Sequence, residues 1–215
     1  MKSRNIAYLP EVDHLRAFAA LLIVFYHGLH LLRSRLLHDQ PFDFSHWIST
    51  TNVPLAAIDY RELPLNYARE FDAVACLSSS IFEMPNNAEL HRAFSSMRGV
   101  LRDGGILVLT NGMCDRTWRE KPRFIPEISR GDFTRLFVID YFERGARFNV
   151  VDLHHHGSHE EMKVWSITYD RVYLQDDIAS ALQAAGFRTC SFYGNYEFQP
   201  YDKETSGMLI AVAQK

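Results

Sequence analysis

Three consecutive segments decide the fold: FDAVACL (Phe71–Leu77), NAELHRAFSSMRGVL (Asn87–Leu101) and GILVLTNG (Gly105–Gly112). The first and third are short apolar runs, which is typical of strands buried on both faces of a sheet. The middle segment has helical spacing, with Leu90, Phe94, Met97 and Leu101 on one face. RDGG (102–105) separates it from the third segment and predicts a tight turn. Strand, helix, turn and strand together predict a βαβ unit of a parallel sheet.

The sequence after this unit predicts more strands and one more helix. Two strand-like stretches, 134–156 and 161–173, predict an antiparallel insert over about 132–173, with a hairpin turn at Glu143–Gly145. Residues 174–187 predict a helix that ends at Gly186, and 188–196 and 207–215 predict two terminal strands. The predicted fold class is α/β, an incomplete Rossmann-like sheet with an antiparallel β insert.

The amino-terminal region differs in character. LRAFAALLIVFYHGLHLL (Leu15–Leu32) is rich in Leu and Ala and lacks Pro, so it predicts an apolar helix. Its length is compatible with a buried core helix, a partner-facing helix or a marginal membrane segment. A signal peptide is disfavoured, because no cleavage site of small residues follows the segment. We therefore divide the chain into an apolar helical segment, 1–50, and an α/β domain, 55–215.

Composition and charge exclude several classes of protein. Of 215 residues, 47% are hydrophobic and 23% charged, as in a globular protein, and the net charge of −3 predicts no nucleic-acid partner. The three cysteines, Cys76, Cys114 and Cys190, are far apart and indicate a reducing compartment, so we expect a cytoplasmic protein without a disulfide framework or a thiolate zinc site.

A histidine cluster is the most conspicuous group of titratable residues: His154, His155, His156 and His159. On a strand, His154 and His156 share one face, where one of them could act as a general base or both could bind a metal. Alternatively, the four histidines simply belong to a polar strand end that runs into a turn at Gly157. Likewise, Tyr141 and Trp165 fit either a lid over a substrate or packing within the strands.

Four motifs resemble the carboxy-terminal two-thirds of class I S-adenosylmethionine-dependent methyltransferases. They are IDYRELPL (58–65), FDAVACLSSSIFEM (71–84), LRDGGILVLTNG (101–112) and AAGF (184–187), and the resemblance covers about 160 residues. The most similar enzymes of that family act on small molecules and include N,N-dimethylating enzymes of amino-sugar pathways. The resemblance implies S-adenosylmethionine as the cofactor and methyl transfer to the nitrogen or oxygen of a small-molecule acceptor.

The resemblance also implies roles for individual residues. Asp59, followed by Tyr60, matches the acidic position that accepts a hydrogen bond from the adenine amino group. Cys76, Leu77 and Ser78 match the strand end that lines the methyl donor, and Asn111 and Gly112 could border the acceptor.

One part of the family pattern is missing from the sequence. No Gly-x-Gly occurs, so the glycine-rich loop and the acidic residue that holds the ribose have no counterpart. We therefore expect a truncated domain with an impaired cofactor site. The alternative is a non-catalytic or partner-dependent protein, in which a homodimer or a completing partner covers an exposed parallel edge.

The amino-terminal segment resembles a second family. YLPEVDHLRAFAALLIVFYH (Tyr8–His27) is similar to the first transmembrane helix of acyltransferase-3 enzymes, and Arg16 and His27 match the spacing of its basic residue and catalytic histidine. This resemblance implies a remnant of a membrane O-acyltransferase, with membrane contact through residues 15–32 and His27 as its base.

Overall fold

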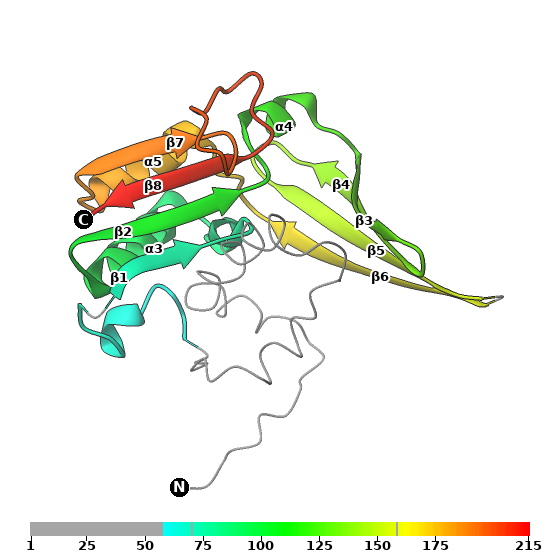
Figure 1. Ribbon diagram of the computed structural model, residues 1–215, viewed down its shortest axis with the longest axis horizontal. Helices are drawn as coiled ribbons and strands as arrows, with labels where there is room; N and C mark the ends of the chain where they lie inside the picture. Colours follow the sequence, from blue (N-terminus) through cyan, green and yellow to red (C-terminus); the bar gives the residue numbers. More distant parts are fainter. Residues whose placement is uncertain (1–57, 70, 158) are drawn as a thin grey trace, which may run out of the picture.

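The computed structural model describes residues 58–69, 71–157 and 159–215. Within these ranges the chain forms two four-stranded sheets, with strand orders β1-β2-β8-β7 and β3-β4-β5-β6. Figure 1 shows them as two separate layers that meet where β1 and β2 end. The predicted helix 15–32, His27 and the acyltransferase-like segment lie outside the described residues.

The first sheet contains the predicted βαβ unit. Strand β1 (Phe71–Cys76) pairs in parallel with β2 (Leu101–Asn111), and α3 (Asn87–Val100) connects them. Helix α3 starts where Asn86 accepts a hydrogen bond from the Glu89 backbone, an ordinary N-cap. Its predicted apolar face is confirmed, because Leu90, Phe94 and Met97 are fully buried.

The terminal elements complete this sheet. Helix α5 (Gln175–Ala184) is followed by Gly186 in a left-handed conformation, φ 88°, which favours glycine. Strand β7 (Thr189–Tyr193) lies at one edge, and β8 (Leu209–Gln214) pairs antiparallel with both β2 and β7. Helices α3 and α5 lie side by side on one face of the sheet (Figure 1). The mixed α/β sheet that the sequence predicts is therefore present.

The second sheet is a meander inserted between β2 and α5. Its strands are β3 (Phe124–Arg130), β4 (Phe133–Tyr141), β5 (Ala146–His156) and β6 (His159–Tyr169), each antiparallel to the next. The β4–β5 turn needs Gly145, because a Cβ there would lie 2.2 Å from the Tyr169 carbonyl oxygen. The predicted hairpin turn at 143–145 is thus confirmed.

Two sequence expectations are corrected. The insert begins at Phe124, not near residue 132, because β3 adds an edge strand that contains Pro126. A proline is compatible with an edge strand but obscures its pattern. RDGG (102–105) is not a turn outside the strand but part of β2, where the register with β1 shifts between Phe71 and Ala73 and Gly104 takes φ 81°.

Short helices complete the architecture. Leu63–Leu65 (η2) and Ser80–Glu83 (η3) are 3-10 turns on either side of β1, and α4 (Asp115–Glu120) follows β2. Within the described ranges no helix is long and apolar enough to cross a membrane.

Candidate functional site

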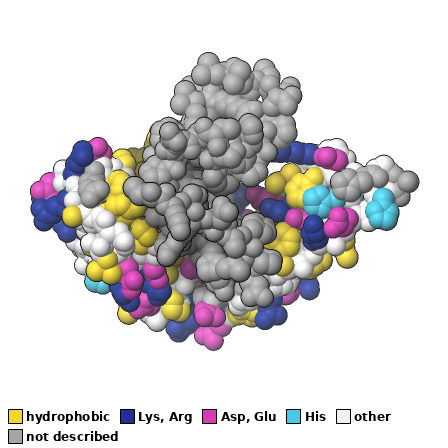
Figure 2. Space-filling model, turned by 90° about the horizontal axis from the view of Figure 1, so that it is seen from below, with side chains coloured by type: hydrophobic (Ala, Val, Ile, Leu, Met, Phe, Trp, Pro, Cys, Tyr) yellow, Lys and Arg dark blue, Asp and Glu magenta, His cyan; other side chains and the backbone are white. Residues whose placement is uncertain are grey.

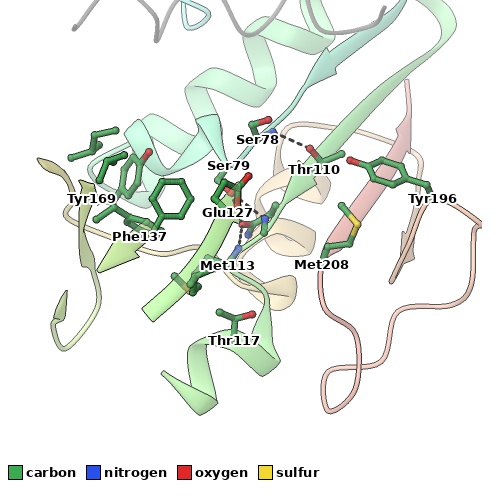
Figure 3. A pocket seen from close by; sticks show the side chains of 16 residues that line it. Ser78, Ser79, Thr110, Met113, Thr117, Glu127, Phe137, Tyr169, Tyr196 and Met208 are labelled. Atoms are coloured by element: carbon green, nitrogen blue, oxygen red, sulfur yellow. Dashed lines mark hydrogen bonds between the residues drawn. The ribbon is translucent and has the colours of Figure 1, made fainter. Parts of the chain in front are cut away.

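A cavity of about 420 Å³ opens where the two sheets meet. Its floor is the carboxyl end of β1 and β2, and its opposite wall is one face of the insert (Figure 3). In α/β sheets, ligands bind at the carboxyl ends of parallel strands, so the cavity occupies the expected place for a ligand. The residues that line it are Ser78, Ser79, Thr110, Asn111, Gly112, Met113, Thr117, Ile125, Glu127, Phe137, Phe148, Val150, Ile167, Tyr169, Tyr196 and Met208.

The strand-end side of the cavity is built on two serines in an uncommon conformation. Ser78 and Ser79 both have positive φ, 59° and 64°. Two consecutive non-glycine residues in the left-handed region are costly and persist only where the surroundings hold them. Here the Ser78 N–H donates to Thr110 Oγ1 at 2.9 Å, and the Ser79 N–H donates to the Thr110 carbonyl at 3.0 Å. Strand β2 thereby fixes the loop that leaves β1.

Asn111 is the centre of this arrangement and is fully buried. Its Oδ1 accepts from the Ser79 hydroxyl at 3.0 Å and from the Met113 N–H at 2.9 Å. Its Nδ2 donates to the Tyr173 carbonyl at 3.1 Å, which attaches the start of α5 to the same point. Asn111 therefore holds three segments in place around the cavity floor.

The insert side of the cavity is aromatic. Phe137, Phe148 and Tyr169 line it, with ring centroids 5.9 Å apart for Phe137–Phe148 and 5.6 Å apart for Phe148–Tyr169, both edge-to-face. Tyr169 also contacts Phe82 of η3 at 5.7 Å. This chain of rings ties the insert to the core of the first sheet.

Glu127 is the only acidic residue of the lining, and its side chain is exposed to solvent. It comes from β3, the strand that sequence reasoning missed. The sequence gives little signal for this strand, because Pro126 and Glu127 interrupt its apolar residues.

Two further lining residues come from the loop between β7 and β8. Tyr196 and Met208 lie near its two ends. Helix α4 anchors this loop: Arg116 and Arg119 donate to the backbone carbonyls of Thr205 and Glu204, and the Cys114 thiol donates to the carbonyl of Ser206. The cavity is thus assembled from four separate stretches of chain.

The predicted cofactor residues have different positions. Ser78 lines the cavity. Cys76 and Leu77 are buried, and burial raises the pKa of the Cys76 thiol to about 12. Tyr60 is buried too, and its hydroxyl donates to the Ser80 carbonyl at 2.9 Å. Of these, only Ser78 contributes to the cavity wall, so any contact of the other three with a cofactor remains a prediction.

Both carboxylate oxygens of Asp59 already accept hydrogen bonds from its neighbour Arg61. Its Oδ1 accepts from the Arg61 N–H and Nε, and its Oδ2 from Nε and Nη2, which fills the usual acceptor positions of a carboxylate. The Arg61 guanidinium also holds the pKa of Asp59 below its ordinary value. A hydrogen bond from an adenine amino group would require Arg61 to give up part of this contact.

Asn111 and Gly112, predicted to border an acceptor, both line the cavity. The histidine side chains that the structure describes do not. His154 lies four residues beyond Val150 on β5, roughly 13 Å further along the strand, and its ring contacts Phe133 at 4.9 Å. His156 is still nearer the tip, where Figure 2 shows histidines among charged side chains. Among the described residues, no group of three or more His, Cys, Asp or Glu could hold a metal ion.

Trp165 and Tyr141 make packing and hydrogen-bond contacts within and next to the insert. The Arg135 guanidinium lies 5.4 Å from the Trp165 ring and 5.6 Å from the Phe133 ring, and donates to both oxygens of the buried Asp152 at 2.7 Å. Tyr141 donates to the Pro122 carbonyl. The packing interpretation of these two aromatic residues therefore fits their observed contacts better than a lid.

Several solved structures with the same fold are methyltransferases. An S-adenosylmethionine-dependent methyltransferase from Clostridium acetobutylicum aligns with a TM-score of 0.63 at 14% identity, over 79% of this chain and 68% of its own. An amino pentose methyltransferase from Micromonospora echinaspora, solved with S-adenosylmethionine bound, gives 0.53 at 20% identity, over 88% and 70%. A sugar N-methyltransferase from a Streptoalloteichus species gives 0.54 at 23% identity, over 79% and 66%.

At these identities the likeness shows the fold, and the chain spans about two thirds of those proteins. Neither the models of known protein families nor the curated protein sequences gave a match to this chain, so the acyltransferase-3 resemblance gains no support.

Proposed function

We propose that this protein transfers a methyl group from S-adenosylmethionine to an amine of a small molecule. One observation carries the proposal: a cavity at the carboxyl ends of β1 and β2 combines a rigid polar floor with an aromatic wall and a single carboxylate. The fold shared with S-adenosylmethionine-dependent methyltransferases supports the reaction class.

The described residues fit the methyl-donor end of such a cofactor. The polar Ser78 and Ser79 stand at the strand end where a donor would lie, and their backbone is fixed before any ligand binds. The cofactor supplies an electrophilic methyl group on a positively charged sulfur, so the protein needs no covalent intermediate. The chain's own task is to align the acceptor and exclude water.

The wall opposite favours an amine over an alcohol as the acceptor. Amines are protonated near neutral pH, and the Glu127 carboxylate together with the aromatic rings of Phe137 and Tyr169 suits a cation. The bound ammonium must first lose a proton to solvent, because only the neutral amine can form the new nitrogen–carbon bond. The carbon–sulfur bond would break in the same step and leave its electron pair on the sulfur, and the methylated ammonium then loses one proton. Glu127 is placed to bind the ammonium form and to pass that proton to solvent, to which it is exposed.

Two measurements test this function. Titration calorimetry of the full chain with S-adenosylmethionine should give saturable binding, and absence of binding at millimolar cofactor would refute methyl transfer as a whole. Mass spectrometry should then detect a methyl gain on members of a panel of small amines, including amino sugars, and not on their hydroxyl analogues.

Glu127→Gln addresses the amine assignment separately. We expect the KM for a reactive amine to rise at least tenfold with unchanged cofactor binding, while Glu160→Gln, at the far tip of the insert, changes neither. An unaltered KM in Glu127→Gln would remove Glu127 from the reaction but leave methyl transfer standing.

A further inference from the structure

The insert sheet is apolar on both faces. Its inner face lines the cavity through residues such as Ile125, Phe137 and Val150. Because successive side chains on a strand point to opposite faces, their sequence neighbours form an outer face. We call its apolar residues the outer strip: Phe124, Pro126, Leu136, Val138, Val151, Leu153, Met162 and Val164.

The outer strip is continuous, and its members are exposed or half-buried. Pro126, Leu136, Val151 and Val164 form one row across all four strands, paired neighbour to neighbour. No member of the strip is buried, and Phe124, Met162 and Val164 are 61%, 65% and 56% exposed. The outer face of an antiparallel sheet is ordinarily polar, and an apolar patch of this kind marks an interaction surface.

Charges at the two ends of the strip identify the partner. Four residues before Val151 on β5 stands Arg147, and four residues after it stands His155, opposite the acidic Glu160. At the basic end Asp140 is already engaged by Asn149, at 3.0 Å, and by Arg123, at 3.6 Å. At the acidic end His155 Nδ1 lies 3.6 Å from Glu160. The ends thus carry opposite charge at equal distances from the central row.

A twofold axis through this row, in the plane of the interface and perpendicular to the strands, makes the surface complementary to itself. It places the apolar row on its own copy, with each strand over its own copy, so that Arg147 of one chain lies over His155 of the other and one strand away from Glu160. From these observations we propose that the outer strip binds a second copy of this chain, face to face and with strands reversed. This proposal does not depend on the proposed reaction.

The size of the surface is adequate for such a dimer. Eight residues separate Arg147 from His155, about 27 Å along the strand, and four strands span roughly 19 Å. The resulting footprint of roughly 500 Å² in projection corresponds to a larger accessible area, near the lower end of the range for specific interfaces.

Sedimentation equilibrium of the full chain tests the proposal. The wild type should dimerise at micromolar concentration, and Val164→Glu should weaken the dimer at least tenfold. Lys163→Gln is the matched control, because it changes the charge by the same amount one residue away on the inner face, and it should leave the dissociation constant unchanged. Circular dichroism of each variant verifies that the sheet remains folded.

Charge reversal tests the geometry. Arg147→Glu and Glu160→Arg should each weaken the dimer, and the double variant should restore it. The two residues stand at opposite ends of one chain's strip, so only a contact between chains can give this rescue. A monomeric wild type, which would result if another segment of the same chain covers the strip, overturns the proposal. The proposal is also overturned if Val164→Glu leaves the dissociation constant of the dimer unchanged. The same holds if the double charge reversal does not restore the dimer.

Discussion

The two four-stranded sheets of this protein are built in opposite ways. The first joins strands distant in sequence and buries its apolar side chains beneath α3 and α5, whereas the insert joins each strand to the next and leaves one apolar face exposed. The cavity takes its fixed polar donors from the first sheet and its aromatic wall and carboxylate from the second. The comparison teaches that the rigid polar side and the aromatic side of the cavity come from different parts of the chain.

The largest contrast is expected from the same substitution in the two sheets. Leu90→Ala removes a fully buried side chain from α3 and should lower the free energy of unfolding by about 3–4 kcal/mol. Leu136→Ala, on the outer strip, should cost the isolated chain less than about 1 kcal/mol. Urea unfolding of both variants at low protein concentration measures the difference. Equal losses would mean that the insert is as tightly packed as the first sheet.

Two asparagines extend the comparison to hydrogen bonds. Asn111→Ala removes the side chain that accepts from the Ser79 hydroxyl and the Met113 N–H and donates to the Tyr173 carbonyl, and we expect a loss of about 2–3 kcal/mol. Asn149 in the insert also makes three contacts, with Val138, Asp140 and Ser166, but it is only half-buried. Asn149→Ala should therefore cost about 1 kcal/mol. Thermal unfolding that ranks the two in the reverse order would contradict this interpretation.

Two carboxylates give a smaller contrast in stability, and here the larger loss is expected in the insert. Asp152 in the insert is buried and binds Arg135 with both oxygens, whereas Asp72 of β1 pairs with Arg102 on the surface. Because Arg135 retains partial solvent access, we expect about 1–2 kcal/mol for Asp152→Asn, and at most about 0.5 kcal/mol for Asp72→Asn. A fluorescence change from Trp165, next to Arg135, should accompany the first substitution alone. Equal effects would show that burial of Asp152 contributes little.

The smallest effect concerns pH. The pKa of Asp59 is lowered in the folded protein by Arg61, so the unfolded chain binds a proton at a higher pH than the folded chain does. The stability from this pair is therefore complete above the unfolded pKa near 4 and is lost as the pH falls through the lower, folded pKa. Asp59→Asn should destabilise the protein slightly at pH 6, and the deficit should shrink as the pH falls below the unfolded pKa. A deficit of the same size at every pH would point to lost packing.

The apolar patterns predicted the first sheet better than the insert. The sequence predicts β1, β2, α3 and the start of α5 because the apolar residues of each segment follow the pattern of one kind of buried element, either strand or helix. Strand β3 is not predicted, because Pro126 obscures the pattern of an edge strand. Helix α4 is not predicted, because its sequence DRTWRE contains a single large apolar side chain.

Site prediction depended on where a side chain points. Ser78, Asn111 and Gly112 follow from the rule that ligands lie at strand ends, and all three line the cavity. His154 attracted attention by its residue type alone, but its register on β5 carries it toward the tip. Glu127 is brought to the cavity because β3 pairs with β4, with Glu127 at the irregularity between the paired residues Pro126 and Ile128, and no local pattern encodes this long-range pairing.

The position of β8 has a consequence for synthesis of the protein. Residues 209–214 form an inner strand of the first sheet, between β2 and β7. Until they emerge from the ribosome, β2 exposes a row of unpaired backbone groups, and β7 has no neighbour in the sheet. By then the meander of the insert has been translated in full, and its local pairings can form early. The nascent chain thus passes through a stage with a complete insert and an incomplete first sheet, when the open edge of β2 is most exposed to aggregation or chaperone capture.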